Sequence, residues 1–312
     1  MEDRNNPLLC VIGPTASGKT RLAVALADFY HAEILSADSR QVYRQMDIGT
    51  GKDKEEYIVE GRSIPFHLID IVEVGYHYNI FEYQRDFYKA YAAIRKRNRN
   101  AILCGGSGMY IDSVLRNYRL DKVPENKELR LQLESVSMET LIEKLSQLTS
   151  LHNHTDTCDR DRLIRAIEIQ EFYKKYPELK DKKKFNSLIF YVHFEREILR
   201  EQITQRLVER LHHGMIEEVE AILHKGISPK VMMYYGLEYK YITLYIMGEL
   251  SYNEMKDQLN TAIHQFAKRQ CTWFRGMQRK GMKFHIIDGS LPDKEKLATL
   301  TPIVEAWGGF FV

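Results

Sequence analysis

The sequence predicts an α/β protein in which a parallel sheet is flanked by helices and interrupted by a smaller all-helical insertion. Short apolar runs alternate with helical patterns through the first third of the chain, and a glycine-rich stretch follows the first run directly. From about residue 117 the strand signals stop, and charged helical sequence continues to about residue 186. We therefore expect a core formed by residues 1–116 and 187–312, the latter with C-terminal helices, and a separate helical domain at 117–186.

The first part of the core is expected to contain four short strands, at residues 8–13, 33–38, 66–71 and 101–106. A helix is expected from about Lys19, where Leu22, Leu26 and Phe29 recur at helical spacing, and another at residues 80–96. Short buried strands separated by helices are typical of a parallel sheet covered on both faces. Polar and catalytic groups of such a sheet gather at the carboxyl ends of its strands.

The chain is expected to return to the sheet at residues 187–194 and to add a last strand at 284–288. Between them a helix is predicted by four apolar residues that recur every four positions, which is the spacing of one buried face. These residues are Leu199, Ile203, Leu207 and Leu211.

Composition indicates the cellular compartment of the protein but does not indicate its function. The 312-residue chain has a net charge of only +2, so bulk charge indicates no acidic partner. Its four cysteines are scattered, and Cys10 and Cys104 lie in apolar runs, as buried thiols do in a reducing compartment. A polar N-terminus leads straight into the first strand, with no signal peptide or membrane span. We expect a cytoplasmic protein that does not enter a membrane.

The glycine-rich stretch "GPTASGKT" fits the phosphate-binding pattern G-x-x-x-x-G-K-[ST]. Its glycines let successive backbone N–H groups point at phosphate oxygens, and the following helix directs its positive end to the same place. Lys19 adds a full charge, and the Thr20 hydroxyl is a ligand for Mg²⁺. The stretch lies between a predicted strand and a predicted helix, so the fold is expected to be P-loop NTPase-like. The loop recognises a diphosphate or a triphosphate. The pattern alone does not require that this ligand be a nucleotide.

Two aspartates end apolar runs and are candidates for the chemistry beside the phosphate. Asp70 is more simply explained as the polar end of a strand. Asp38 lies in the polar stretch "SADSRQVYRQMDIGTGK", which is poor core material and suited to a binding loop. A carboxylate there is a candidate general base.

Several motifs in order resemble the tRNA dimethylallyltransferases, also called tRNA isopentenyltransferases. They are "GPTASGKT", "SADSRQVYRQMDIGTGK", "IPFHLIDI", "CGGSGMY", "RDRLIRAIE" and "AKRQCTWFR", spread over residues 8–288. The resemblance implies that the loop holds dimethylallyl diphosphate rather than ATP. It also implies transfer of the dimethylallyl group to N6 of the adenosine immediately 3′ of the anticodon, with release of diphosphate.

The resemblance assigns the chemistry to particular side chains. Asp38 takes the proton of the amine, Ser107 matches a threonine near the reacting adenosine, and Arg206 matches an arginine that holds the diphosphate. Thr20 holds Mg²⁺ as the implied cofactor. The implied diphosphate-binding residues are Gly13, Pro14, Thr15, Ala16, Ser17, Gly18, Lys19 and Thr20. Without the resemblance, Arg206 is better explained as an exposed helix arginine paired with Glu209 or Glu217.

The resemblance also implies contacts with the anticodon stem-loop of tRNA, in part from the helical insertion. The expected RNA-binding residues are Asp38, Ser39, Arg40, Gln41, Ser107, Arg130, Asp161, Arg162, Leu163, Ile164, Arg165, Lys268, Arg269 and Arg275. Arg162 and Arg165 stand three apart on a predicted helix and share a face.

The last motif is expected to lie on a helix with two stripes. His264, Lys268 and Arg275 form the cationic stripe, which meets RNA phosphates. The apolar stripe comprises Leu259, Ile263, Phe266 and Trp273, so that Trp273 is a core residue rather than a platform for a base.

The chain departs from the usual family pattern in places that concern RNA. Ile263 and His264 stand where a Thr-Arg pair is common, and Gln202 stands where an arginine is usual. The segment "YYGLEYK" replaces an "IGYKE"-like one but keeps Gly236, and the insertion is short near residues 176–185. These changes concern RNA affinity and the choice of tRNA rather than the core chemistry.

Other functions remain open from the residues alone. One is a small-molecule P-loop kinase that transfers phosphate to a hydroxyl near Asp38, and a related one is an adenylate isopentenyltransferase acting on free nucleotides. A third is an RNA-binding protein whose loop no longer binds phosphate. The basic C-terminal helices and the long insertion favour RNA, and the intact Lys19, Thr20 and Asp38 favour an enzyme. We expect it to act as a monomer.

Overall fold

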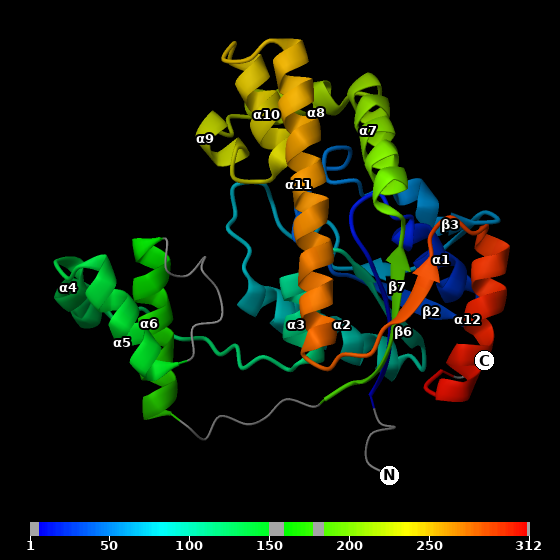
Figure 1. Cartoon of the computed structure of the whole chain (residues 1–312), viewed down its shortest axis with the longest axis horizontal. Coiled ribbons are helices and arrows are strands. Elements are labelled where there is room, and N and C mark those ends of the chain that lie inside the picture. Colours follow the sequence, from blue (N-terminus) through cyan, green and yellow to red (C-terminus); the bar gives the residue numbers. More distant parts are fainter. Residues whose placement is uncertain (1–5, 150–158, 177–183, 311–312) are drawn as a thin grey trace. The chain divides into compact units, whose positions relative to one another are not determined.

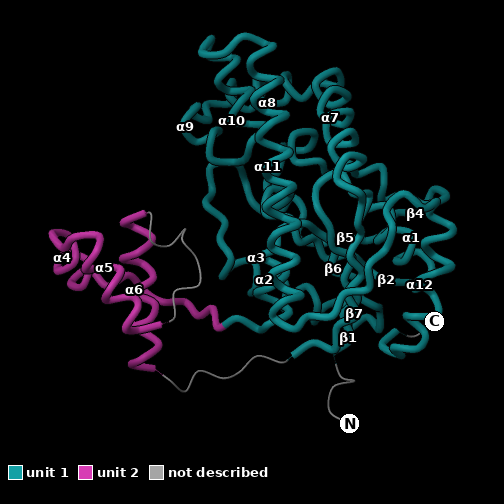
Figure 2. The backbone as a smooth tube through the Cα atoms, viewed as in Figure 1, with its two compact units in different colours: residues 1–118, 183–312 teal, residues 119–182 magenta. Residues whose placement is uncertain are grey.

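A computed structural model describes residues 6–149, 159–176 and 184–310. The chain divides into two compact units: unit 1 is residues 1–118 and 183–312, and unit 2 is residues 119–182 (Figure 2). Each unit has its own hydrophobic cluster. The polar, charged sequence of residues 119–182 thus packs on itself, while the two apolar segments on either side of it form one sheet.

Unit 1 is built on a six-stranded parallel sheet with strand order β5-β2-β6-β1-β7-β8 (Figure 1). The strands are β1 (Pro7–Ile12), β2 (Ala32–Ser36), β5 (Phe66–His67), β6 (Asn100–Gly105), β7 (Asn186–His193) and β8 (His285–Asp288). The glycine-rich loop leaves β1, which lies between β6 and β7 in the middle of the sheet. The predicted α/β fold with a flanked parallel sheet is confirmed.

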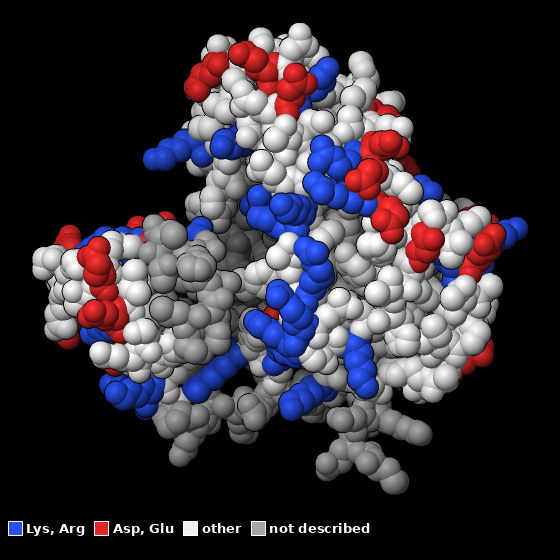
Figure 3. Space-filling model, viewed as in Figure 1, with Lys and Arg blue, Asp and Glu red and all other residues white. Residues whose placement is uncertain are grey.

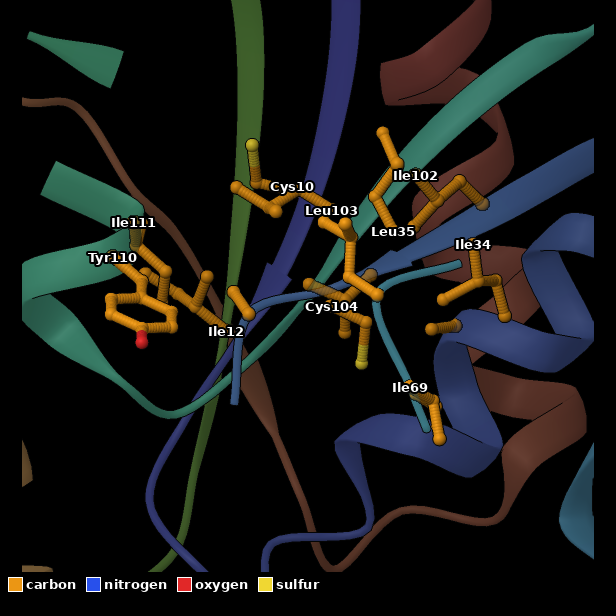
Figure 4. Packing of buried hydrophobic residues seen from close by; sticks show 14 of the residues in the cluster. Cys10, Ile12, Ile34, Leu35, Ile69, Ile102, Leu103, Cys104, Tyr110 and Ile111 are labelled. Carbon is orange, nitrogen blue, oxygen red and sulfur yellow. The ribbon is translucent and has the colours of Figure 1, made fainter. Parts of the chain in front are cut away.

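Helices cover both faces of this sheet. On one face α1 (Lys19–Phe29) packs with α12 (Asp293–Trp307), and on the other α2 (Ile80–Lys96) packs with α3 (Gly108–Leu115) (Figure 1). Every residue of β1 and β6 is buried. Figure 4 shows the resulting core, in which Ile12, Leu103 and Ile34 come from neighbouring strands. The thiols of Cys10 and Cys104 are buried and free, as predicted.

The C-terminal part of unit 1 is helical. It contains α7 (Arg196–His212), α8 (Met215–His224), α9 (Pro229–Met232), α10 (Leu237–Ile246) and α11 (Tyr252–Arg279). Leu199, Ile203, Leu207 and Leu211 form the buried face of α7, so this prediction is confirmed. The long helix α11 starts at a capping box between Ser251 and Glu254 and packs against α7, α10 and α3.

One prediction about unit 1, the end of the third strand, is wrong in detail. The third strand ends at His67 instead of Ile71, because Leu68 and Asp70 have left-handed backbone angles, φ 67° and 55°, which no strand accommodates. Phe29 is 50% exposed although it continues the helical spacing of Leu22 and Leu26. It lies in the last turn of α1, where its ring packs edge-on against Tyr30 instead of entering the core.

The segment after β2 contains short elements instead of a helix. It runs through a 3₁₀ turn, η2 (Lys54–Tyr57), and a hairpin of β3 (Ile58–Val59) and β4 (Arg62–Ser63) before reaching β5. Most of the polar motif that begins at Ser36 is therefore loop. That loop belongs to no strand of the sheet, and an isolated bridge joins its Tyr43 to Val72.

Unit 2 consists of α4 (Lys127–Glu134), α5 (Met138–Leu148) and α6 (Arg160–Lys175). Their buried residues form the second hydrophobic cluster, which includes Leu141 and Leu163. One buried carboxylate, Glu168, accepts hydrogen bonds from Arg130 at 2.7 and 2.9 Å and from Arg165 at 3.1 Å. In the described part of the chain, no helix combines the length and the apolar character that crossing a membrane requires.

Candidate functional site

A large cavity, of about 1070 Å³, opens at the carboxyl ends of the strands of unit 1. Three loops that leave neighbouring strands reach it: the glycine-rich loop after β1, the polar segment after β2 and Ser107 after β6. Helix α7 contributes Arg206 and α11 contributes Arg269 and Gln270. The cavity therefore collects the predicted phosphate loop, Asp38–Gln41, Ser107 and Arg206 in one place.

The glycine-rich loop has the backbone that phosphate binding needs. Ala16 and Gly18 adopt left-handed angles, φ 60° and 68°, just before α1 begins at Lys19. A side chain at position 13 would lie 2.8 Å from the Ser17 hydroxyl and 3.0 Å from the Val192 carbonyl, so only glycine fits. The buried Ser17 hydroxyl has no hydrogen-bond partner in the described structure.

One N–H of this loop is already engaged. The backbone N–H of Thr15 donates to the side-chain oxygen of Gln270 at 2.8 Å, and the amide nitrogen of Gln270 donates to the Gly106 carbonyl at 2.9 Å. The Thr15 N–H is therefore already hydrogen-bonded and does not face the cavity as a free donor. The later N–H groups of the loop and those at the start of α1 are the ones from which hydrogen bonds to an anion would be expected.

Lys19 sits at the base of the cavity, where its ammonium donates to the Pro14 carbonyl at 3.1 Å. Desolvation lowers the pKa of Lys19 below its ordinary value of 10.5, while the nearby Cys104 and Asp38 oppose the shift. An anion bound beside the ammonium would favour its charged form.

The Asp38 segment is held in a tight turn against Ser107. The Asp38 carboxylate accepts the backbone N–H of Arg40 at 2.8 Å, and the Ser107 hydroxyl accepts the backbone N–H of Ser39 at 2.9 Å. The Gln41 amide donates to the Gly51 carbonyl at 2.9 Å. The two predicted acceptor-side residues, Asp38 and Ser107, are thus fixed relative to one another.

Arg206 does not pair with Glu209 or Glu217, so that alternative is wrong. It forms an ion pair with Asp53, which Arg210 also contacts at 3.1 Å. Burial by itself raises the pKa of the Asp53 carboxyl group. The two arginines lower this pKa by more than burial raises it, so the pKa lies below its ordinary value of 3.8 and the carboxylate is held charged. Both guanidinium groups lie against Gly51, where an added Cβ would be 2.2 Å from Arg210. Arg210 is a cavity residue that the sequence analysis missed, although it follows Arg206 by one helical turn.

The loop that follows Asp38 is held by a carboxylate far away in the sequence. Glu218 of α8 accepts the backbone N–H groups of Asp47, Ile48 and Gly49 at 2.8, 2.7 and 3.0 Å. It also accepts the Tyr239 hydroxyl at 2.6 Å. Nothing in the sequence around Glu218 indicates this role.

Asp70 has a structural role, but it is not the polar end of a strand, since β5 ends at His67. It forms ion pairs with the buried Lys52 at 2.5 Å and with Lys54 at 2.8 Å. Lys52 also donates to Asp47 at 2.7 Å and to the Tyr43 carbonyl at 2.6 Å. These contacts tie the loop after β2 to the start of the next segment and leave Asp38 as the candidate base.

Helix α11 carries basic residues next to the cavity. Lys268, Arg269 and Arg275 are exposed, and Figure 3 shows Lys and Arg side chains gathered along this helix. Trp273 is partly buried against the core, with its indole on Gly108, so the prediction that it is a core residue is confirmed. Phe266 is 39% exposed, so it is not a core residue of the apolar stripe, and it lines the cavity together with Ile263.

Comparison with known proteins decides the family. A model of the family described as "IPP transferase" matches residues 41–277. The chain belongs to this IPP transferase family. It is 56% identical to tRNA dimethylallyltransferase 2 of Bacteroides fragilis over 291 residues, 93% of this chain and 95% of that protein. It is 54% identical to tRNA dimethylallyltransferase 1 of Parabacteroides distasonis over 298 residues, 95% and 97% of the two chains.

Solved structures agree on the fold. The full-length tRNA isopentenylpyrophosphate transferase of Bacillus halodurans superposes with a TM-score of 0.71 at 27% identity, covering 97% of each chain. A eukaryotic dimethylallyltransferase described as acting on tRNA superposes with a TM-score of 0.79 at 20% identity, covering 97% of this chain and 80% of that one. The P-loop-type sheet predicted from the sequence is therefore the fold of the IPP transferase family.

The residues of unit 2 that are expected to bind RNA differ in the exposure and ion pairing of their side chains. Leu163 and Ile164 are buried in the second cluster, so the RNA contact predicted for them stays a prediction that concerns their backbone groups. Arg130 and Arg165 are engaged by Glu168. Asp161 and Arg162 are exposed.

His264 replaces a cationic residue of the usual family pattern with an imidazole. Its ring nitrogen lies 3.2 Å from the Thr204 hydroxyl. Desolvation and the nearby Arg200 lower the pKa of His264 below its ordinary 6.5. This shift disfavours the charged form of His264, and Lys268 and Arg275 are the other two cations of the stripe.

Proposed function

We propose that the chain transfers a dimethylallyl group from dimethylallyl diphosphate to N6 of the adenosine immediately 3′ of the anticodon in tRNA. Membership of the IPP transferase family supports this activity, as do the close relatives named tRNA dimethylallyltransferase. The observation that carries the residue assignments is this cavity. It is lined by the phosphate loop, by Asp38 and Ser107, and by Arg206.

The donor diphosphate binds to the glycine-rich loop. Lys19, the free N–H groups of the loop and the start of α1 neutralise its oxygens, and Arg206 and Arg210 approach from α7. In this structure Asp53 forms ion pairs with both Arg206 and Arg210. A diphosphate brings more negative charge than one carboxylate, so it competes for the same guanidinium groups.

The site fits Mg²⁺ as the cofactor. The Thr20 side chain lines the cavity beside Lys19, and Glu56 lines it too, which gives the oxygen donors that Mg²⁺ prefers. Within the described residues, no group of three or more His, Cys, Asp or Glu is placed to hold a metal. Thr20 would therefore hold the ion together with substrate oxygens. Bound there, Mg²⁺ would stabilise the charge on the leaving diphosphate.

The acceptor adenosine is placed between Asp38 and Ser107. The bond between the allylic carbon and the diphosphate oxygen breaks, a bond from N6 to that carbon forms, and the N6 proton passes to the Asp38 carboxylate. The turn that Asp38 makes with the Arg40 N–H aims its carboxylate at a fixed point. The Ser107 hydroxyl, held on the same segment through Ser39, positions the base.

RNA binds through the exposed cations. Lys268, Arg269 and Arg275 on α11 and Arg162 on α6 contact phosphates, which positions the RNA without reading its sequence. Ser39, Arg40 and Gln41 meet the splayed target base. Arg130 and Arg165 reach RNA only with the part of each guanidinium that Glu168 leaves free. We place this reaction in the cytoplasm and assign it to a monomer.

A transfer assay tests the proposal against its rivals. Purified protein, Mg²⁺ and labelled dimethylallyl diphosphate are mixed with unmodified tRNA, with AMP, or with a tRNA that has guanosine after the anticodon. Labelled ATP is tested as an alternative donor. The proposal predicts label on the first tRNA alone and no transfer from ATP. Label on AMP instead would indicate an adenylate isopentenyltransferase, and phosphate transfer from ATP would indicate a kinase.

A further inference from the structure

A large aromatic side chain stands exposed beside the cavity without a role in the reaction described above. Tyr234, between α9 and α10, is 49% exposed. The next residue, Tyr235, is fully buried and lines the cavity, as does Gly236. Tyr234 therefore lies on the surface directly beside the cavity wall.

The neighbours of Tyr234 are those that bind nucleic-acid bases. The Arg40 guanidinium lies over its ring, 5.8 Å from the centroid. The ring of His77 meets it edge-on, with centroids 4.9 Å apart and planes at 76°. Arg40 lines the cavity and is two residues from Asp38, so Tyr234 is joined by contact to the segment that holds the candidate base.

A single exposed tyrosine needs no explanation, since folded proteins expose many apolar atoms. This one differs because two other exposed or half-exposed planar groups, His77 and Arg40, are gathered on it. Unpaired RNA bases are bound by stacking on aromatic rings and on guanidinium planes. A base stacked on Tyr234 would meet both kinds of partner.

We propose that Tyr234, with Arg40 and His77, forms a stacking platform for the unpaired base next to the target adenosine. The inference rests on the proposed function, because it takes the ligand to be an RNA loop. Entry of the target adenosine into the cavity requires that base to leave its stack. Its neighbour then loses a stacking partner, and the Tyr234 ring supplies another at the edge of the cavity.

The test compares RNA affinities measured without any donor, so it does not depend on turnover. Binding of a fluorescent anticodon stem-loop is measured for the wild type and for Tyr234→Ala, Tyr234→Leu and Tyr234→Phe. The matched control is Tyr252→Ala, which removes an exposed tyrosine that packs on Tyr245 away from the cavity. Two further RNAs carry an abasic nucleotide on the 5′ or the 3′ side of the target adenosine.

Loss of one stacked base weakens binding about tenfold. We expect that loss for Tyr234→Ala and Tyr234→Leu, near wild-type binding for Tyr234→Phe, and no change for Tyr252→Ala. With one of the two abasic RNAs, wild type and Tyr234→Ala should bind equally, because the partner base is already absent. Equal binding of wild type and Tyr234→Ala to the intact RNA would overturn the platform. So would a tenfold difference that persists on both abasic RNAs.

Failure of the proposed function has a different signature. A wild-type protein that binds the stem-loop through Tyr234 but transfers no dimethylallyl group would overturn the reaction and keep the platform. If wild type and Tyr234→Ala both transfer the group and have the same KM for RNA, the reaction is kept and the platform is overturned.

Discussion

The side-chain oxygen of Gln270 accepts the backbone N–H of Thr15 at 2.8 Å, across 255 residues of sequence. The same amide donates to the Gly106 carbonyl at 2.9 Å. One buried side chain of α11 thus joins the phosphate loop to the loop that carries Ser107. The helix that carries the exposed Lys268 and Arg275 is therefore attached directly to the glycine-rich loop.

Gln270→Leu should weaken both the fold and donor binding. Leucine keeps the approximate size but leaves the Thr15 N–H and the Gly106 carbonyl without a partner, and each such buried group costs about 1–3 kcal/mol. We expect the free energy of unfolding to fall by about 2–4 kcal/mol in urea titrations, and the KM for dimethylallyl diphosphate to rise. Gln265→Leu, an exposed position on α11, is the control. If both variants behave alike, the amide bridge has no special role.

Asp38→Asn should abolish chemistry without disturbing the turn. The asparagine oxygen still accepts the Arg40 N–H, whereas the amide takes no proton from N6. General base catalysis contributes about 10²–10⁴-fold, so kcat should fall by that factor. The Kd for tRNA should stay close to the wild-type value, because the asparagine oxygen still accepts a hydrogen bond from the RNA. A kcat near the wild-type value would remove Asp38 from the mechanism.

The affinity for dimethylallyl diphosphate should fall as the pH rises above the depressed pKa of Lys19. Desolvation lowers this pKa in the free protein, and a bound anion raises it again. The ligand therefore prefers the protonated form, and binding at alkaline pH takes up a proton until the pKa of the complex is passed. Lys19→Ala should bind more weakly at every pH and lose this component of the pH dependence. Identical slopes in titrations of the two proteins would exclude Lys19 as the source.

Unit 2 should lose stability in acid because of Glu168. Burial alone raises its pKa, but hydrogen bonds from Arg130, the Asn126 N–H and Arg165 lower it to about 2. A carboxylate with a depressed pKa contributes its stability above its ordinary value of 4.5, and that contribution disappears as the pH falls from 4.5 toward 2. Hydrogen exchange should show this loss as weaker protection of the backbone amides of α4, α5 and α6 at the lower pH.

Glu168→Gln provides the matched test. The neutral amide pairs poorly with two arginines, so the variant should be about 2–3 kcal/mol less stable at pH 7. Its stability should also change less between pH 5 and pH 3. Glu143→Gln, an exposed position on α5, should behave as the wild type. An unchanged acid sensitivity in Glu168→Gln would show that another group titrates.

The sequence predicts the parts of this protein that depend on local pattern. The parallel sheet follows from short apolar runs, and the phosphate loop follows from spacing of Gly13, Gly18 and Lys19. The end of β5 does not, because it depends on the left-handed angles of Leu68 and Asp70 and lies beside the long-range ion pairs of Asp70 with Lys52 and Lys54. A non-glycine residue gives no sign of such an angle in advance.

Contacts between distant segments also escaped prediction. The Glu218 carboxylate holds three N–H groups of a loop about 170 residues earlier, and Asp53 pairs with Arg206 across 153 residues. Each of these residues is an ordinary charged side chain in the sequence. Arg130 and Arg165 illustrate the converse, since the pattern suggests RNA ligands and the structure shows that both also hold Glu168.

The most direct test of the account is the identity of the modified nucleoside. After reaction with dimethylallyl diphosphate, tRNA is digested and its nucleosides and fragments are analysed by mass spectrometry. The account predicts one dimethylallyl group on N6 of the adenosine immediately 3′ of the anticodon, absent with Asp38→Asn. A dimethylallyl group on another nucleotide, or equal modification by Asp38→Asn, would contradict it.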